Sequence, residues 1–229
     1  MKIQLLVPAA GMGTRLEADG PKALTRLAGQ PMIVRTLTRF APLGLVDEAV
    51  IVVPPGCQDA FEAVLADAFP HATLQVVPGG AERQDSVDHG LAALDPRTGI
   101  VVIHDAARPF VSAESVQASI AAARECGAAT VAIPSVDTIL QGDGEAYLER
   151  TPDRRRMWAC QTPQTFRVDV IREAHRHART HGFVGTDDAS LVRRIGGRVK
   201  LVMGTPLNLK VTTPTDLVFA EAAIREGLV

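Results

Sequence analysis

The chain has 229 residues, of which 46% are hydrophobic and 22% charged, and its formal net charge is −2. This length and composition fit one large α/β domain with a substantial core. The near-neutral charge and an aromatic content of 4% argue against nucleic acid as a partner. No apolar run approaches the ~20 residues of a membrane helix, so no membrane partner is expected. The first residues lack a signal-peptide pattern and the three cysteines are widely spaced, so we expect a cytoplasmic protein.

Strand-like and helix-like segments alternate along the first 135 residues. Residues 3–7 form a short apolar run, and similar runs recur at 49–53, 73–77, 100–103 and 129–133. Between these runs apolar residues recur at helical spacing, as at Ile33, Leu37 and Phe40. The alternation predicts an α/β fold: a Rossmann-like, mostly parallel twisted sheet with helices on both faces.

The alternation is interrupted in the middle of the chain. Two short apolar triplets, 138–140 and 146–148, flank a segment in which Asp143-Gly144 is the expected turn of a β-hairpin. A projecting hairpin has little core of its own. We therefore expect this arm, about residues 136–161, to pack on something else, such as another subunit.

The sequence pattern of the last part predicts three further helices, a short one among them, and a late strand. Helical spacing returns around 171–178, the segment 186–190 precedes a short helix, and 199–202 is strand-like. The segment 213–216, Thr-Pro-Thr-Asp, is typical of a helix start, because it combines a cap, an early proline and a favourable charge. The chain ends on this helix, so we expect a single domain, 1–229, with the arm inserted within it.

A loop of small residues follows the first strand: Pro8-Ala9-Ala10-Gly11-Met12-Gly13-Thr14-Arg15, with Lys22 shortly after. Its spacing fits neither a Walker P-loop nor a dinucleotide fingerprint, since Leu16 stands where the third glycine belongs. Small residues allow close approach of a ligand, and successive backbone N–H groups can bind anions. A nucleotide triphosphate site explains the loop and its two cations; from the glycines alone, a tight turn with two surface cations explains it equally well.

Three later segments carry polar groups toward the same edge of the sheet. Gly80 and Ser86 follow one strand, where a plain turn with a cap is the simpler interpretation. Asp105 and Arg108 follow another strand. Asp105 is suited to hold Mg²⁺, directly or through water, or to accept hydrogen bonds from substrate hydroxyls. Arg108 offers a planar fork for phosphate, and the alternative is a structural Asp–Arg pair. Lys210 closes a late strand-like region, where it would face a triphosphate from the opposite side.

The densest basic cluster is Arg154-Arg155-Arg156, within the arm. A solvated charge run is one interpretation. Binding of an anionic second substrate by one of these arginines is the other.

Six segments occur together in one order, and together they resemble a known family: Pro8-Ala9-Ala10-Gly11-x-Gly13-x-Arg15 with Pro21-Lys22, Gly79-Gly80-x-x-Arg83-x-x-Ser86-Val87, His104-Asp105-Ala106-Ala107-Arg108-Pro109, Thr162-Pro163-Gln164-x-Phe166, Thr186-Asp187-Asp188-Ala189-Ser190 and Asn208-Leu209-Lys210-Val211-Thr212. The family is 2-C-methyl-D-erythritol 4-phosphate cytidylyltransferase, of the non-mevalonate isoprenoid pathway. The resemblance runs from the first strand to the last helix. It implies transfer of the cytidylyl group of CTP to methylerythritol 4-phosphate, with release of pyrophosphate.

The resemblance also implies roles for matching residues. Arg15, Lys22 and Lys210 would be catalytic, steadying the triphosphate and the developing charge, with Mg²⁺ bridging phosphates. The nucleotide would be bound by Pro8, Ala9, Ala10, Gly11, Gly13, Gly80, Ser86 and Ala106. Methylerythritol phosphate would be bound by Asp105, Arg108, Thr162 and Thr186. The family's homodimer, joined by the arm, would add Thr138 and Arg154 from the other subunit.

Two positions depart from the family pattern: Ala23 stands where glutamine is usual, and Ala81 where a polar residue often follows the double glycine. A cytidylyltransferase for another polyol phosphate, such as ribitol 5-phosphate, is the alternative within the same chemistry. A non-catalytic nucleotide-binding module is the alternative of another class. The three cations Arg15, Lys22 and Lys210 argue against it, because simple binding would not need all three.

Overall fold

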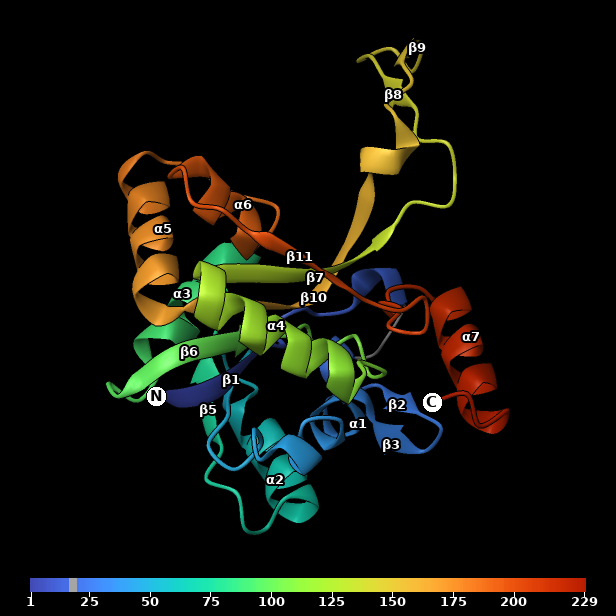
Figure 1. The fold of residues 1–229 in the computed structure, drawn as a ribbon. Coiled ribbons are helices and arrows are strands. Elements are labelled where there is room, and N and C mark those ends of the chain that lie inside the picture. Colours follow the sequence, from blue (N-terminus) through green and yellow to red (C-terminus); the bar gives the residue numbers. More distant parts are fainter. Residues whose placement is uncertain (17–19) are drawn as a thin grey trace.

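A seven-stranded sheet organises the chain (Figure 1), and the computed structural model describes residues 1–16 and 20–229. The strands lie in the order β11 (Lys200–Met203), β7 (Ala128–Pro134), β10 (Trp158–Arg167), β6 (Thr98–Ile103), β1 (Lys2–Pro8), β4 (Val50–Val53) and β5 (Gln75–Pro78). The pairings are parallel except those of β10, which runs antiparallel to β6 and β7. The prediction of a mostly parallel sheet is confirmed.

Helices cover both faces of the sheet because its central strands are apolar on both sides. In β1, Leu5 and Val7 join a core with α1 (Met32–Thr38), α2 (Gln58–Ala68) and α4 (Ala113–Cys126). The intervening Leu6 points to the other face, toward α3 (Arg83–Ala92), α5 (Val168–Thr180) and α6 (Asp188–Arg194). Helices lie between the strands as the apolar spacing predicted, and α4 is capped by Ser112, whose side chain accepts from the Ser115 N–H. In the described part of the chain, no helix has the length and apolar character needed to cross a membrane.

The central strand β10 was not predicted by the sequence pattern. It contains Pro163, and proline argues against a central strand because it cannot donate to the ladder. The structure accommodates this residue where the pairing of β10 with β7 shifts register, between Cys160 and Gln164. The buried polar side chains of this strand are also bonded, since Gln164 Nε2 donates to Thr130 Oγ1 at 3.0 Å.

The arm projects from the end of the sheet where β7 ends and β10 begins (Figure 1), as a two-stranded hairpin of β8 (Gln141–Gly142) and β9 (Leu148–Arg150). A hairpin is present, but its strands lie at 141–142 and 148–150, not at 138–140 and 146–148. The connection is also longer than the expected Asp-Gly turn, because Asp143 Oδ1 accepts from the N–H groups of Glu145 and Tyr147. The short helical turn Arg154–Arg156 precedes β10.

The last helix, α7 (Pro214–Arg225), begins with a capping box, as expected from its sequence. Thr213 is its cap, and Asp216 bonds back to the cap N–H. A small apolar cluster, which includes Leu16, Ala107 and Val211, lies between this helix and the loops after β1 and β6. The remaining short elements are β2 (Arg26–Leu27), β3 (Gln30–Pro31) and helical turns at Thr14–Leu16, Lys22–Leu24 and Ala41–Leu43.

Candidate active site

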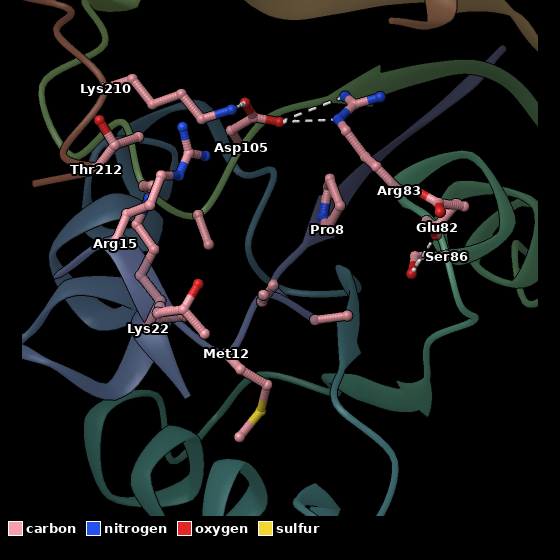
Figure 2. Close-up of a pocket in the computed structure, with 18 of the residues that line it drawn as sticks. Pro8, Met12, Arg15, Lys22, Glu82, Arg83, Ser86, Asp105, Lys210 and Thr212 are labelled. Carbon is pink, nitrogen blue, oxygen red and sulfur yellow. Dashed lines mark hydrogen bonds and ion pairs between the residues drawn. The ribbon is translucent and has the colours of Figure 1, made fainter. Parts of the chain in front are cut away.

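A cavity of about 380 Å³ lies at the carboxyl ends of β1, β5 and β6 (Figure 2). Ligands of open α/β sheets bind at this edge of the strands. Its lining is made by the loops that follow these strands and by a segment near the C-terminus: Pro8, Ala9, Ala10, Gly11, Met12, Gly13, Thr14, Arg15, Lys22, Ala23, Gly80, Ala81, Glu82, Arg83, Ser86, Asp105, Ala106, Ala107, Lys210 and Thr212. The predicted catalytic and nucleotide-binding residues are all among them.

The loop after β1 folds back on itself and brings its two cations together. The Lys22 N–H donates to the Gly11 carbonyl at 3.0 Å, and the Leu16 N–H donates to the Gly13 carbonyl at 2.8 Å. Gly13 has a φ of +73°, and a Cβ at this position would lie 3.0 Å from Lys22 Cβ. Glycine is therefore required here both for the turn and for the approach of Lys22.

The second glycine loop, after β5, is held by Ser86. Its hydroxyl accepts from the Gly80 N–H and donates to the Glu82 carbonyl, each at 3.1 Å. Ser86 lies inside α3 and is not its cap; the cap is Glu82, which forms a capping box with Asp85. A Cβ on Gly80 would overlap Asp85 Cβ, so this glycine is required by the fold.

Gly80→Ala is expected to lower the free energy of unfolding by about 1–3 kcal/mol, because the added methyl displaces Asp85 from the capping box. Gly11→Ala is the matched control: a Cβ there meets nothing within 4 Å, so we expect no loss of stability. Thermal and urea unfolding of the two variants measure the difference. Equal stability of the two variants would contradict this account of Gly80.

Three cations from two distant segments converge on the cavity (Figure 2): Arg15 and Lys22 from the loop after β1, and Lys210 from near the C-terminus. Burial lowers the pKa of Lys22 to about 8, with further contributions from the charges of Lys210 and Arg15. The free protein thus holds like charges close together. Such a cluster is stabilised by a polyanion between its members.

Lys210 lies in a loop between β11 and α7, and the strand-like interpretation of its segment was wrong. The segment is held by bonds to its flanks instead. The Val211 N–H donates to the Ala107 carbonyl at 2.9 Å, and Asn208 Nδ2 donates to the Thr162 carbonyl at 2.8 Å. These bonds fix the backbone on both sides of Lys210.

Asp105 lies between two cations. Its Oδ2 is 2.7 Å from Lys210 Nζ, and its Oδ1 is 3.3 Å from Arg83 Nη2. Burial raises the pKa of Asp105, but Arg83 and Lys210 outweigh burial and hold that pKa well below its usual range. Its own N–H donates to Thr162 Oγ1 at 3.1 Å. Asp105 is therefore an ionised carboxylate with a fixed orientation.

The comparison with family models decides the relationship that the six motifs suggested. The model described as 2-C-methyl-D-erythritol 4-phosphate cytidylyltransferase matches residues 3–226. The chain belongs to this family. The resemblance drawn from the motifs is confirmed, and with it the enzyme class, since the family is one of nucleotidyltransferases.

Individual members of this cytidylyltransferase family are similar to the chain over nearly its full length. The chain is 43% identical to the enzyme of that name from Pelotomaculum thermopropionicum, over 98% of this chain and 94% of that one. It is 45% identical to the one from Symbiobacterium thermophilum, with 98% and 93% covered. The crystal structure of the enzyme of that name from Thermus thermophilus superposes with a TM-score of 0.80, at 37% identity, covering 98% of this chain and 100% of that one.

Five of the residues predicted for the second substrate of the cytidylyltransferase do not line the cavity. Thr162 and Arg108 lie beside it. The Arg108 Nη1 and Nη2 donate to the carbonyls of Asn208 (2.7 Å) and Cys160 (3.2 Å), so the suggested Asp105–Arg108 pair is not formed. Thr186 is exposed before α6. Thr138 and Arg154 lie in the arm, away from the cavity. The binding roles of these residues stay predictions.

Arg83 and Thr212 line the cavity but were given no role from the sequence. Arg83 stands within one of the quoted motifs, and its place at the start of α3, after a strand, was the available signal. Thr212 is held by Asp216, whose Oδ2 accepts from the Thr212 N–H and hydroxyl at 2.8 and 2.7 Å. Burial raises the pKa of Asp216, but the hydrogen bonds from Thr212 and Thr213 outweigh burial and lower that pKa to about 2.

The surroundings of Asp105 do not fit a direct bond from its carboxylate to Mg²⁺. Both carboxylate oxygens face cations, Arg83 and Lys210, and Mg²⁺ would compete with them. Across residues 1–16 and 20–229, no group of three or more His, Cys, Asp or Glu side chains is placed to hold a metal. A contact of Asp105 with Mg²⁺ through water stays a prediction.

Proposed function

We propose that the chain transfers the cytidylyl group of CTP to 2-C-methyl-D-erythritol 4-phosphate, giving 4-diphosphocytidyl-2-C-methyl-D-erythritol and pyrophosphate in isoprenoid precursor biosynthesis. The observation that carries the proposal is the convergence of Arg15, Lys22 and Lys210 on one cavity, in a chain of this family. Ribitol 5-phosphate is not favoured as the acceptor, because the matched family and its relatives are named for methylerythritol phosphate.

The reaction proposed is displacement at phosphorus. A phosphate oxygen of methylerythritol phosphate attacks the α-phosphorus of CTP. The bond from that phosphorus to the bridging oxygen of the β-phosphate breaks, and its electron pair leaves with pyrophosphate. Negative charge grows on the α-phosphate oxygens and on the leaving group, so Arg15, Lys22 and Lys210 act by placing positive charge there. Little proton transfer is required of the protein.

The nucleotide would lie against backbone supplied by small residues. The loop of residues 8–13 consists mostly of small residues, so a nucleotide can approach its backbone closely. The Ser86 hydroxyl accepts from the Gly80 N–H and so holds the second glycine loop in place beside it. Mg²⁺ would accompany the triphosphate and supply positive charge to it; because this hard cation keeps several waters, it would need no direct protein ligand.

The proposed assembly is a homodimer of single-domain subunits in which each arm completes the partner's second-substrate site. Its support is an arm that exposes apolar surface in the isolated chain: Val136, Tyr147 and Leu148 are 81%, 70% and 62% exposed. Thr138 and Arg154 lie in this arm, outside the cavity of their own chain. The expected cytoplasmic setting rests on the three free cysteines and stays a prediction.

The test is turnover of the purified protein with CTP, Mg²⁺ and each of two acceptors, methylerythritol 4-phosphate and ribitol 5-phosphate. Pyrophosphate release and the mass of the product are measured together. We expect the CDP-alcohol from methylerythritol phosphate. Turnover of ribitol phosphate alone would overturn the choice of acceptor, and CTP binding without turnover of either would indicate a non-catalytic module.

CTP binding should be accompanied by proton uptake at pH 8. Lys22 has a pKa of about 8 in the free protein, and the triphosphate raises it, so about half a proton per site is taken up at that pH. At pH 6.5 the lysine is already protonated and its contribution vanishes. Calorimetry in two buffers of different ionisation enthalpy measures the uptake. The same titration of Lys22→Met is the control, and an equal uptake by this variant would contradict the assignment to Lys22.

A further inference from the structure

Asp188 is a buried carboxylate that does not line the cavity, and its side chain is 1% exposed. It is the first residue of α6, and its N–H donates to Gln164 Oε1 at 3.0 Å. Its Oδ1 lies 3.2 Å from Nε2 of His175, which is buried too. These contacts fix the carboxylate from the far side of the cavity wall, so its position does not depend on a ligand.

Arg83 connects this carboxylate to the cavity. Its Nη1 donates to Asp188 Oδ2 at 2.8 Å, while its Nη2 and Nε donate to Asp105 Oδ1 at 3.3 and 3.4 Å. Figure 2 shows Arg83 reaching Asp105 from the side opposite to Lys210. The planar guanidinium is suited to span two carboxylates at once, which a lysine ammonium on a flexible stem is not.

Asp105 is thereby oriented by a chain of alternating charges: Asp188, Arg83, Asp105 and Lys210. Arg83 holds Oδ1 of Asp105, and Oδ2 is left for Lys210. Without the charge of Asp188, Arg83 is drawn more strongly to Asp105, and both the carboxylate and Lys210 lose their present placement. The residues affected are those assigned to the second substrate and to the transferred phosphate.

We infer that Asp188 is a positioning residue, which acts through Arg83 to orient Asp105 for the acceptor alcohol phosphate and Lys210 for the transferred phosphate. The inference rests on the proposed function for the identity of that acceptor. It distinguishes Asp188, which has no contact with the cavity, from the residues that touch substrate.

The test is a comparison of the two Michaelis constants in Asp188→Asn and Arg83→Lys. We expect KM for methylerythritol phosphate to rise about tenfold in each variant, while KM for CTP changes less than about twofold. A merely structural role would lower the active fraction without separating the two constants. The inference is overturned if both KM values of Asp188→Asn equal those of the wild type, or if both rise equally. If Asp188→Asn does not fold, the two KM values of Arg83→Lys decide by the same criteria.

The double variant shows whether Asp188 acts through Arg83. The double variant should have the same KM for methylerythritol phosphate as Arg83→Lys alone, because Asp188 has no further effect once Arg83 is replaced. Additive increases in KM overturn the inference. Asp95→Asn is the matched control. It removes a carboxylate that binds Lys2 and Arg97 at the opposite end of the sheet, and we expect unchanged constants. Absence of wild-type turnover would instead refute the proposed function.

Discussion

Lys22→Met is expected to lower kcat by about 100- to 1000-fold while it weakens CTP binding less than about tenfold. Lys22 lies in a cluster with Arg15 and Lys210. Its positive charge stabilises negative charge that develops only as the α-phosphorus is attacked. The remaining cations and the glycine loops still bind the ground-state triphosphate. Steady-state kinetics and equilibrium titration with CTP separate the two quantities. Equal losses in kcat and in binding would contradict a transition-state role.

The same substitution should stabilise the free protein. The folded pKa of Lys22, about 8, is below its ordinary value of 10.5, so the unfolded chain binds more protons between those pH values. Stability therefore rises with pH across this window, and below pH 8 the charged lysine imposes its full cost. With solvent screening, Lys22→Met gains about 1 kcal/mol near pH 7, or a Tm about 2–4 °C higher, and the gain fades toward pH 10.5.

Lys200→Met is the matched control for both measurements. Lys200 is an exposed lysine on β11 and lies outside the cavity lining. We expect wild-type kcat and an unchanged pH dependence of stability. A gain in Tm at Lys200 equal to that at Lys22 would assign the effect to overall charge, not to the cation cluster.

The parts of the fold that the sequence predicted are those where local pattern and tertiary environment agree. The strands 3–7, 49–53 and 100–103 are apolar on both faces, and the helices between them have an apolar face at helical spacing. Strand β10 could not be found this way, because its centre contains Pro163 and its burial relies on hydrogen-bonded glutamine and threonine side chains. Periodicity of apolar residues contains no information about such pairs.

In the candidate site, too, some residues could be predicted from the sequence and others could not. Its glycine loops and the cations Arg15 and Lys22 were predictable, since they follow strands in the sequence and strand ends meet at one edge of a sheet. Lys210 was found through its motif alone, because the strand expected before it is a loop. The pair between Arg83 and Asp188 joins residues 105 positions apart, on the starts of two helices. Neither residue has a local signal for this contact. The orientation of Asp105 by Arg83 is therefore a property of the assembled fold, and only the structure could supply it.

Mixing two inactive variants should restore about a quarter of the wild-type activity if each arm serves the partner subunit. The variants are Lys22→Met, with a defective cavity, and Arg154→Ala, with a defective arm. For Arg154→Ala alone we expect kcat/KM for methylerythritol phosphate to fall about 100-fold, because a charge-assisted contact to its phosphate is lost. In an equal mixture after subunit exchange, half of the dimers combine both chains, and one of their two sites has an intact cavity and an intact arm.

The recovery of activity depends on which subunit each arm serves, and not on how strongly either substitution lowers activity. An arm that served its own subunit would leave every site in the mixture with one defect, so no activity would return. Arg150→Ala is the matched control, because Arg150 is also an exposed arginine of the arm and its Nε donates to Gln141 Oε1 within the hairpin. We expect this variant to be active alone. Rescue that is absent under conditions where subunits demonstrably exchange would refute the shared site and leave the role of Lys22 intact.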